Sequence, residues 1–305
     1  MKDKVLVTGA NGNLGKKFIL SKADVDICAL VRSEKAKDDL MNFIQANDIQ
    51  DVQIVKCDYL DIHAIKELAR SCAYVLHLVG IIKENKDNSF NIVHKQTTKA
   101  LVEAIKGTGV KKTCYISILG SKESSTNTCF SSRGFAEKLF LDSDVPSLVL
   151  QVPMVLGGSD YASKSLKKNA LSKFNFTFRK LSLEQPIYAS DIVDVIKIDI
   201  SRSLKGDQSP RGIKPLAGPT SLTRERLIMK AAKQLRVKVK VFSLPLFLGY
   251  ALARIFEMLF SYPPITSAML GVLDHDDDID PLPSCKELDI KLTTLDAMLE
   301  TTIKD

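Results

Sequence analysis

The chain opens on a short apolar run followed by a turn with three evenly spaced glycines, and this pattern most restricts its possible folds. Val5 to Val7 has the composition of a buried strand, and Lys16 to Leu20 begins a helical pattern. Between them, Gly9 permits a tight turn out of the strand, Gly12 lets backbone N–H groups approach a pyrophosphate, and Gly15 lets the helix lie close to the sheet. The order of strand, glycine loop and helix predicts a dinucleotide site with the pyrophosphate at the helix N-terminus. A glycine-rich turn without a ligand is the alternative.

The first half of the chain alternates apolar, strand-like runs with helical ones. The expected strands are 4–8, 25–31, 52–57, 74–79, 112–118 and 147–152. The expected helices are 12–22, 33–47, 61–71, 90–108 and 132–143. This alternation predicts an α/β fold, a doubly wound parallel Rossmann sheet whose ligands lie at the carboxyl ends of the strands.

After Pro153 the pattern loosens, which predicts a smaller mixed C-terminal subdomain for a substrate or a partner. We expect residues 1–152, with a returning segment near 185–200, to form the dinucleotide-binding domain, and residues 153–184 and 201–305 to form the smaller subdomain.

Three segments of this second half carry local predictions. Residues 160–180 are basic and irregular, which is typical of a solvated face. A helix is expected over 222–235 with Thr220 or Ser221 as its cap, and a strand with one buried face over 237–241.

The least polar stretch of the chain runs from Val241 to Phe260. Pro245 near its start, and Arg254 and Glu257 near its end, argue against a transmembrane span. Two interpretations stay open: a helix buried in the smaller subdomain, or a surface through which 241–266 meets a membrane or a protein partner.

The acidic run 274–280 lacks the glycine and the terminal glutamate of an EF-hand, so a solvated turn is expected there and no metal site. The six cysteines form no CxxC pair, which fits reduced thiols in a cytoplasmic protein. The first strand begins so near Met1 that we expect no signal peptide. The net charge of +7 is too diffuse for nucleic-acid binding, but it can attract phosphorylated ligands or an anionic lipid surface, such as the inner face of a membrane.

The loop after the second strand predicts which nicotinamide cofactor is bound. An acidic residue there reads a ribose hydroxyl, whereas a cation reads a 2′-phosphate. Leu30 to Ser33 contains no acid, and Arg32 can pair with a phosphate, so NADP(H) is favoured over NAD(H). An exposed loop arginine without a ligand is the alternative. Asp58 is placed to accept from the adenine amino group. The full set of expected cofactor contacts is Thr8, Gly9, Asn11, Gly12, Asn13, Leu14, Gly15, Arg32, Asp58, Leu78, Val79, Gly80, Ser117, Arg133 and Pro153.

These motifs resemble the extended and atypical short-chain dehydrogenase/reductase superfamily, which includes epimerases and dehydratases. The matching segments are Thr8–Gly15, Cys57–Asp58, Gln185–Ile192 and Ala217–Pro219. Within the superfamily, the chain is most similar to the accessory subunit of respiratory complex I and its bacterial relatives, through His77–Ile81, Ser117–Gly120, Ser243–Leu246 and Pro263–Thr266. The resemblance covers nearly the whole chain.

The resemblance implies a catalytic Tyr-x-x-x-Lys pair with a serine or threonine, and the chain departs from that pattern. Aligned on the run from Ser132 to Lys138, the lysine becomes Arg133 and the tyrosine becomes Cys129. The serine position falls on Leu119, or on Ser117 in a looser register. A thiol is shorter than a phenol, and a guanidinium hardly gives up a proton. Tyr115 and Tyr161 are the nearest other phenols, and neither has the required spacing.

Two functions follow from this departure. The first is an NADP(H)-binding protein without the catalytic pair, a cofactor-holding scaffold or redox sensor that docks on a partner or a membrane. The second is an NADPH-dependent reductase or sugar-nucleotide epimerase that uses other residues. A nucleic-acid-binding module has no basic helix and no aromatic platform to support it.

Overall fold

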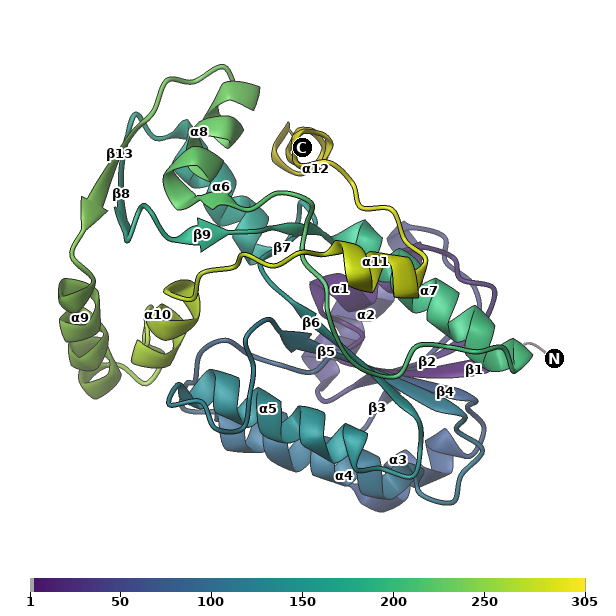
Figure 1. Ribbon diagram of the computed structural model, residues 1–305. Coiled ribbons are helices and arrows are strands. Elements are labelled where there is room, and N and C mark those ends of the chain that lie inside the picture. The colour runs from purple at the N-terminus through teal and green to yellow at the C-terminus, as the bar shows by residue number, and fades with distance from the viewer. Residues whose placement is uncertain (1–2, 305) are drawn as a thin grey trace.

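The computed structural model describes residues 3–304, which are built around one seven-stranded parallel sheet (Figure 1). The strand order is β11-β6-β5-β4-β1-β2-β3, and the bounds are β1 (Lys4–Thr8), β2 (Asp26–Val31), β3 (Val52–Lys56), β4 (Tyr74–His77), β5 (Lys112–Ile118), β6 (Ser147–Val152) and β11 (Gly212–Pro215). The predicted doubly wound Rossmann sheet is confirmed. The seventh strand was not predicted; β11 pairs in parallel with β6, with Gly212 opposite Leu148.

Helices cover both faces of the sheet (Figure 1). One face carries α1 (Asn13–Leu20), α2 (Glu34–Ala46) and α7 (Ala189–Lys205), and the other carries α3 (Ile62–Ala69), α4 (Thr97–Ile105) and α5 (Thr128–Leu141). Because side chains alternate along a strand, Val5 and Val7 pack in the first core and Leu6 in the second. Each strand of the sheet centre therefore reads as a continuous apolar run.

The boundaries of several predicted elements differ from the observed ones, most of them by one or two residues. Strand β4 ends at His77, two residues early. Helix α5 begins at Thr128 because the Asn127 side chain accepts from the backbone N–H groups of Cys129 (2.9 Å) and Phe130 (3.3 Å). The helix predicted over 90–108 is a π-helical turn, η1 (Asn91–Gln96), continued by α4.

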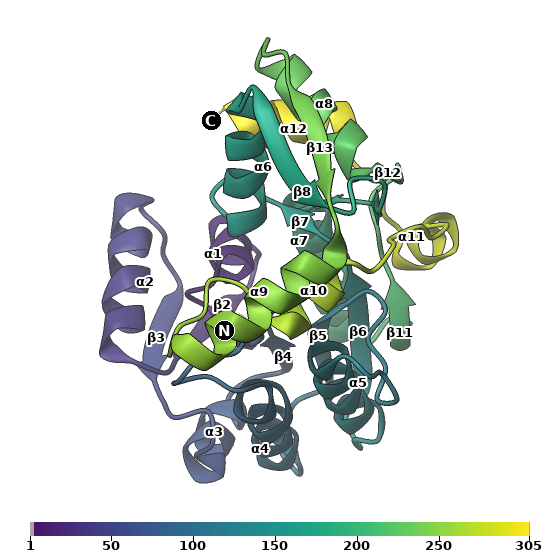
Figure 2. The same ribbon diagram turned by 90° about the vertical axis from the view of Figure 1, so that its left-hand side faces the viewer.

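Apart from α7 and β11, the residues after β6 form short sheets and helices above the carboxyl edge of the sheet (Figures 1 and 2). Their bounds are β7 (Val155–Leu156), α6 (Tyr161–Leu171), β8 (Phe174–Phe178), β9 (Leu183–Glu184), β10 (Ile187–Tyr188), β12 (Leu222–Thr223), α8 (Arg224–Gln234), β13 (Lys240–Leu244), α9 (Leu246–Leu259), α10 (Ser267–Leu273), α11 (Leu282–Leu288) and α12 (Leu295–Lys304). Helices α6, α8 and α12 share a small apolar core that includes Leu166, Ile228 and Met298.

Several local predictions for this part were wrong. The segment 160–180 is not irregular: it forms α6, capped by Asp160, and strand β8. The strand expected over 237–241 lies over 240–244 and pairs with β8. Helix α8 is capped by Thr223, whose hydroxyl accepts from the N–H of Arg226 (3.3 Å), two or three residues after the expected caps.

Helix α9 lies at the outer edge of the molecule (Figures 1 and 2). Within it only Gly249 and Ala253 are buried, whereas Phe247 is 69% exposed, Met258 85% and Leu259 71%. The interpretation of this stretch as a buried helix is therefore wrong. Among the described residues, no helix is both long and apolar enough to span a bilayer.

Candidate functional site

The glycine loop between β1 and α1 has the geometry of an anion site. Gly9 adopts φ +73°, and a Cβ there would lie 3.0 Å from the carbonyl carbon of Leu78. Gly12 caps α1 without any side-chain acceptor, so the first N–H groups of the helix stay available to a ligand. A Cβ on Gly15 would lie 2.5 Å from the carbonyl oxygen of Ala10, which only glycine allows. The loop is packed tightly and presents a positive helix terminus, which fits a pyrophosphate.

A tyrosine that the sequence reasoning missed holds this loop in place. Tyr59 Oη accepts from the Gly9 N–H (2.9 Å) and donates to the carbonyl of Leu30 at the end of β2 (2.9 Å). Burial raises the pKa of Tyr59 to about 12, so the hydroxyl stays protonated and can donate. The only sequence signal was its position next to Asp58.

Arg32 and Asp58 are brought together in a cavity of about 530 Å³ beyond the ends of β2 and β3. Arg32 Nη1 donates to the neutral amide oxygen of Asn88 (2.6 Å). Within residues 3–304, no ion pair involves Arg32. The neighbouring Lys56 is different, because it is paired with Glu34 (2.7 Å). The guanidinium of Arg32 therefore keeps its charge available to an anion.

Three of the expected cofactor contacts, Asn13, Gly80 and Pro153, line a second cavity of about 630 Å³ above the carboxyl edge of the sheet. Leu119, at the position expected for the catalytic serine, lines it too. Leu78 and Val79 are partly buried and pack against the two cores of the sheet. Asn11 and Leu14 stay in the glycine loop and in the first turn of α1.

Arg133 lies behind Gly80 and is buried, with 7% of its surface exposed. Its Nη1 donates to the carbonyl of Ile116 (3.0 Å) and approaches Tyr115 Oη (3.5 Å). Its Nε has no hydrogen-bond partner among the described residues. A buried donor without an acceptor beside the end of β4 fits the bound ribose of a dinucleotide.

Cys129 and Ser117 do not line either cavity. Cys129 is buried on α5, and its Sγ donates to the carbonyl of Ile81 (3.7 Å), while burial raises the pKa of the thiol. Ser117 was expected at the cofactor, but it is buried and donates to the carboxylate of Glu137. The reason is the alternation of β5, which turns Ser117 to the same face as Tyr115, against α5.

Two buried histidines brace the site from below. His77 Nδ1 lies 2.6 Å from Thr8 Oγ1. The Thr8 side chain, which we expected to contact the cofactor, is therefore hydrogen-bonded to His77. His94 Nε2 accepts from the N–H of Ile81 (3.0 Å). Burial lowers the pKa of His77 to about 3; burial and the nearby Arg133 charge lower the pKa of His94 to about 2. Both rings are therefore neutral hydrogen-bonding groups.

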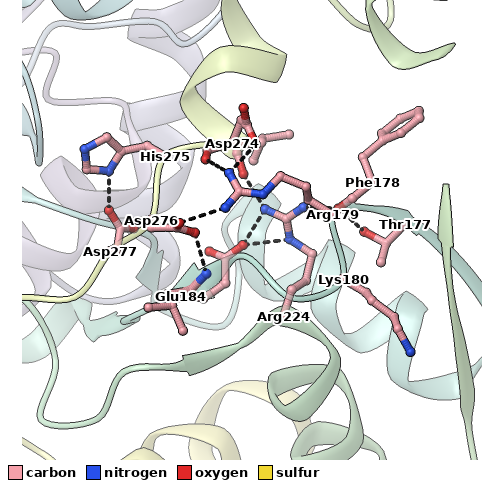
Figure 3. A network of polar contacts seen from close by, with 12 residues as sticks. Thr177, Phe178, Arg179, Lys180, Glu184, Arg224, Asp274, His275, Asp276 and Asp277 are labelled. Atoms are coloured by element: carbon pink, nitrogen blue, oxygen red, sulfur yellow. Dashed lines mark hydrogen bonds and ion pairs between the residues drawn. The ribbon is translucent and has the colours of Figure 1, made fainter. Parts of the chain in front are cut away.

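The wall of the larger cavity far from the glycine loop carries a network of paired charges (Figure 3). Arg179 donates to the carboxylates of Asp274 and Asp276, the latter at 2.7 Å. Arg224 pairs with Glu184 at 2.6 Å. The acidic run 274–280 was expected to be a solvated turn. The structure leaves Asp276 exposed, and it engages Asp274 and Asp276 in ion pairs with Arg179.

His275 belongs to the same network. Its Nδ1 lies 3.0 Å from Asp277 Oδ1, and this hydrogen bond raises the pKa of His275 (Figure 3). Among the described residues, no group of three His, Cys, Asp or Glu side chains is arranged to hold a metal ion.

Comparison with solved structures shows which fold this geometry belongs to. A nucleoside-diphosphate-sugar epimerase from Staphylococcus aureus superposes with a TM-score of 0.73 at 17% identity, covering 97% of this chain and 99% of that one. UDP-glucose 4-epimerase from Bifidobacterium longum, solved with NAD+ and UDP, superposes with a TM-score of 0.73 at 15% identity, covering 98% of this chain and 97% of that one. At these identities the likeness establishes the fold alone.

Two curated proteins are similar in sequence. A ceramide reductase of Caulobacter vibrioides is 27% identical over 158 residues, which are 51% of this chain and 47% of that protein. The mitochondrial NADH dehydrogenase [ubiquinone] 1 alpha subcomplex subunit 9 of Arabidopsis thaliana is 24% identical over 252 residues, 81% of this chain and 61% of that protein. The chain thus matches about half to three-fifths of the length of these relatives.

The resemblance to the atypical short-chain dehydrogenases and their complex I branch is confirmed by these similarities. The family model described as NmrA-like matches residues 1–158, which is more than half of the chain. The chain therefore belongs to the NmrA-like family.

Proposed function

We propose that this protein holds NADP(H) at the β1–α1 loop and does not use the proton transfer of the Tyr-x-x-x-Lys enzymes. The loop supports dinucleotide binding through the positive φ of Gly9 and the uncapped N-terminus of α1. Arg32 supports the choice of NADP(H), because its guanidinium lies beyond the end of β2 beside Asp58, where a 2′-phosphate would sit. Structural neighbours such as the UDP-glucuronic acid 4-epimerase of Bacillus cereus are solved with NAD. The proposed preference for a 2′-phosphate therefore rests on Arg32 and not on these neighbours.

The observation that carries the proposal is the position of Arg133, whose buried guanidinium packs directly behind the backbone of Gly80. In the superfamily pattern the position of Arg133 holds a lysine beside a tyrosine, and here the tyrosine position holds the buried Cys129. Bound nicotinamide would supply hydride chemistry, and Arg133 would orient its ribose from behind Gly80. Tyr115, the nearest phenol to Arg133, is fully buried, and burial raises its pKa, so it does not act as a phenolate.

The test is the absorbance of NADPH at about 340 nm with a panel of carbonyl compounds and sugar nucleotides. We expect no substrate-dependent decay, because no phenol–lysine pair is available to exchange the proton. Decay with any substrate would support the second function, an NADPH-dependent reductase or epimerase with other catalytic residues. That alternative draws on the reductase and epimerases among the similar proteins.

We further propose that the protein docks on an anionic membrane surface through helix α9 and strands β8 and β13. Strands β8 and β13 lie on the same side of the molecule as α9 (Figure 2), and they carry Phe174 (59% exposed), Phe176 (63%) and Phe242 (43%). The rings of Phe176 and Phe242 lie 5.4 Å apart. A patch of this kind on a single chain marks an interaction surface.

The charges beside these aromatic side chains favour a membrane over a protein partner. Lys173 precedes Phe174, and Lys240 lies opposite Phe174 in the register of β8 and β13; both lysines are exposed. Residues 161–180 contain basic but no acidic side chains. Apolar side chains bordered by lysines suit the interface of a bilayer with anionic headgroups.

A further inference from the structure

We infer that the cavity of about 630 Å³ binds a neutral lipid with a long apolar chain, rather than a nucleotide sugar. The inference goes beyond cofactor holding. Asn13, Gly80 and Pro153 line the end of the cavity next to the dinucleotide loop, and the inference concerns the rest of it. The cavity lies between the sheet edge and helices α6, α8 and α10. Its size is that of a site for a small organic ligand.

The walls of the cavity are mostly apolar. The sheet side contributes Ile82 and Leu119, and the opposite side contributes Leu166, Ile228 and Leu270. Ser165 and Asn169 also line the cavity, but a sugar or a nucleotide would still bury most of its surface against apolar side chains. An alkyl chain would instead gain free energy from leaving water.

The polar end of the cavity does not favour an anion. Among the described residues, the wall holds two guanidiniums, Arg179 and Arg224, and each is paired with a carboxylate (Figure 3). The carboxylates in the wall outnumber them: Asp160, Glu184, Asp274 and Asp277. A diphosphate would have to displace a carboxylate from an arginine, at a cost that a neutral head group avoids. The remaining carboxylates are engaged as well, because Asp160 accepts from the Ser163 N–H (2.8 Å) and Asp277 lies 3.0 Å from His275 Nδ1. A cation would have to displace one of these partners too, so the ligand is uncharged at its polar end.

The cavity adjoins the exposed apolar helix. Leu246, the first residue of α9, lines the cavity. Deeper in the helix, a Cβ on Gly249 would lie 3.1 Å from the ring of Phe178 and 3.3 Å from Leu270, and both of these residues also line the cavity. One helix thus presents apolar side chains to the outside while its inner face closes the cavity. A lipid chain in the membrane beneath α9 would have a short apolar route inward.

The test uses the full chain and the neutral dye Nile red, displaced by dodecanol, dodecanoate or UDP-glucose. We expect dodecanol to displace the dye at about tenfold lower concentration than dodecanoate, because the anion meets an excess of carboxylates. UDP-glucose is expected to displace none. Three variants locate the dye: Ala162→Trp fills the cavity from α6, Lys164→Trp puts the same ring on the exposed face of α6, and Met258→Asp disrupts the outer face of α9.

Dye binding should weaken about tenfold or more in Ala162→Trp, and it should be unchanged in Lys164→Trp and Met258→Asp. Displacement by UDP-glucose but not by dodecanol would overturn the inference. So would dye binding that survives Ala162→Trp and disappears in Met258→Asp. NADPH titration and thermal unfolding of the same samples show whether each variant is folded. They also distinguish a failure of cofactor binding, which concerns the proposed function, from a failure of lipid binding.

Discussion

Arg133 is packed directly against Gly80: a Cβ added at Gly80 would lie 2.1 Å from Nη2 of Arg133. The close approach explains why the residue after Val79 must be small. It also places the buried guanidinium, with its unpartnered Nε, immediately behind the backbone at the end of β4.

Gly80→Ala is therefore expected to weaken NADPH binding more than it weakens the fold. The obstacle is the end of a flexible side chain, so Arg133 can move, but it then loses the bond to the Ile116 carbonyl (3.0 Å). Losing one charge-assisted contact to the cofactor costs about 1.5–3 kcal/mol. NADPH titration and thermal unfolding check this. Gly109→Ala is the control, because its Cβ would meet nothing closer than 4.0 Å. Equal affinities of the two variants would contradict a role of Arg133 at the cofactor.

Tyr59→Phe removes the hydroxyl that joins Gly9 to Leu30. The Gly9 N–H loses its acceptor and the Leu30 carbonyl its donor, so the free energy of unfolding should fall by about 1–3 kcal/mol. We also expect weaker binding of both NADPH and NADH, because the loop that both share is less well held. Tyr262→Phe is the matched control in denaturant unfolding, because it removes an exposed hydroxyl that donates to the carboxylate of Asp87. Unchanged stability of the Tyr59 variant would show that the bridge does not support the loop.

Arg32→Ala should weaken NADPH binding and leave NADH binding nearly unchanged. A charge-assisted pair with the 2′-phosphate contributes about 1.5–3 kcal/mol, which corresponds to a tenfold to hundredfold loss of affinity. Arg70→Ala removes an exposed arginine that is paired with Glu67 (2.7 Å), and it should affect neither cofactor. If Arg32→Ala weakened both cofactors equally, the guanidinium would not be reading the phosphate.

His94 should make the protein less stable as the pH falls. Its folded pKa of about 2 lies below the ordinary value of 6.5, so below that ordinary value the unfolded chain binds the proton and the folded chain does not. At about pH 5 this one histidine costs about 2 kcal/mol of unfolding free energy relative to neutral pH. His94→Gln should flatten the dependence of unfolding free energy on pH by that amount. His63→Gln, at an exposed position, is the matched control variant. Parallel curves for His94→Gln and wild type would refute the assignment.

Met258→Asp should abolish flotation of the protein with anionic vesicles. The side chain is 85% exposed on α9, and withholding it from the bilayer forfeits about 1.5–3 kcal/mol before the cost of the new charge is counted. Leu282→Asp is the control, because this leucine is 70% exposed on α11, away from α9 in both views (Figures 1 and 2). Flotation that is absent in the wild type, or equal in both variants, would exclude docking through α9.

The parts of the fold that were predictable depend on local and periodic signals. The glycines of the first loop and the apolar runs of β1 to β6 indicate a parallel sheet, because all of these strands except the edge strand β3 are largely buried on both faces. Strand β11 gave no such signal: it has four residues, ends at Pro215 and exists through its pairing with β6. Helix α6 was missed because only Ser163, Leu166 and Ala170 form its buried face, and the many lysines between them obscure the helical periodicity in the sequence.

Beyond the glycine loop, the candidate site was predictable only where strand ends bring residues together. Arg32 and Asp58 follow neighbouring strands, so their common cavity follows from the strand order. Tyr59 and His94 bond to backbone groups distant in sequence, which no spacing indicates. The exposure of α9 could not be predicted either, because a helix that is apolar on all sides reads the same in a core and at a membrane.

The most direct measurement is a fluorescence titration of the wild-type protein with NADPH and with NADH. The account predicts tight binding of NADPH and binding of NADH weaker by about tenfold or more, because only NADPH carries the phosphate that Arg32 can reach. Equal affinity for the two cofactors would contradict the assignment of Arg32. Binding of neither would mean that the loop of Gly9, Gly12 and Gly15 holds no dinucleotide, and the central claim would be wrong.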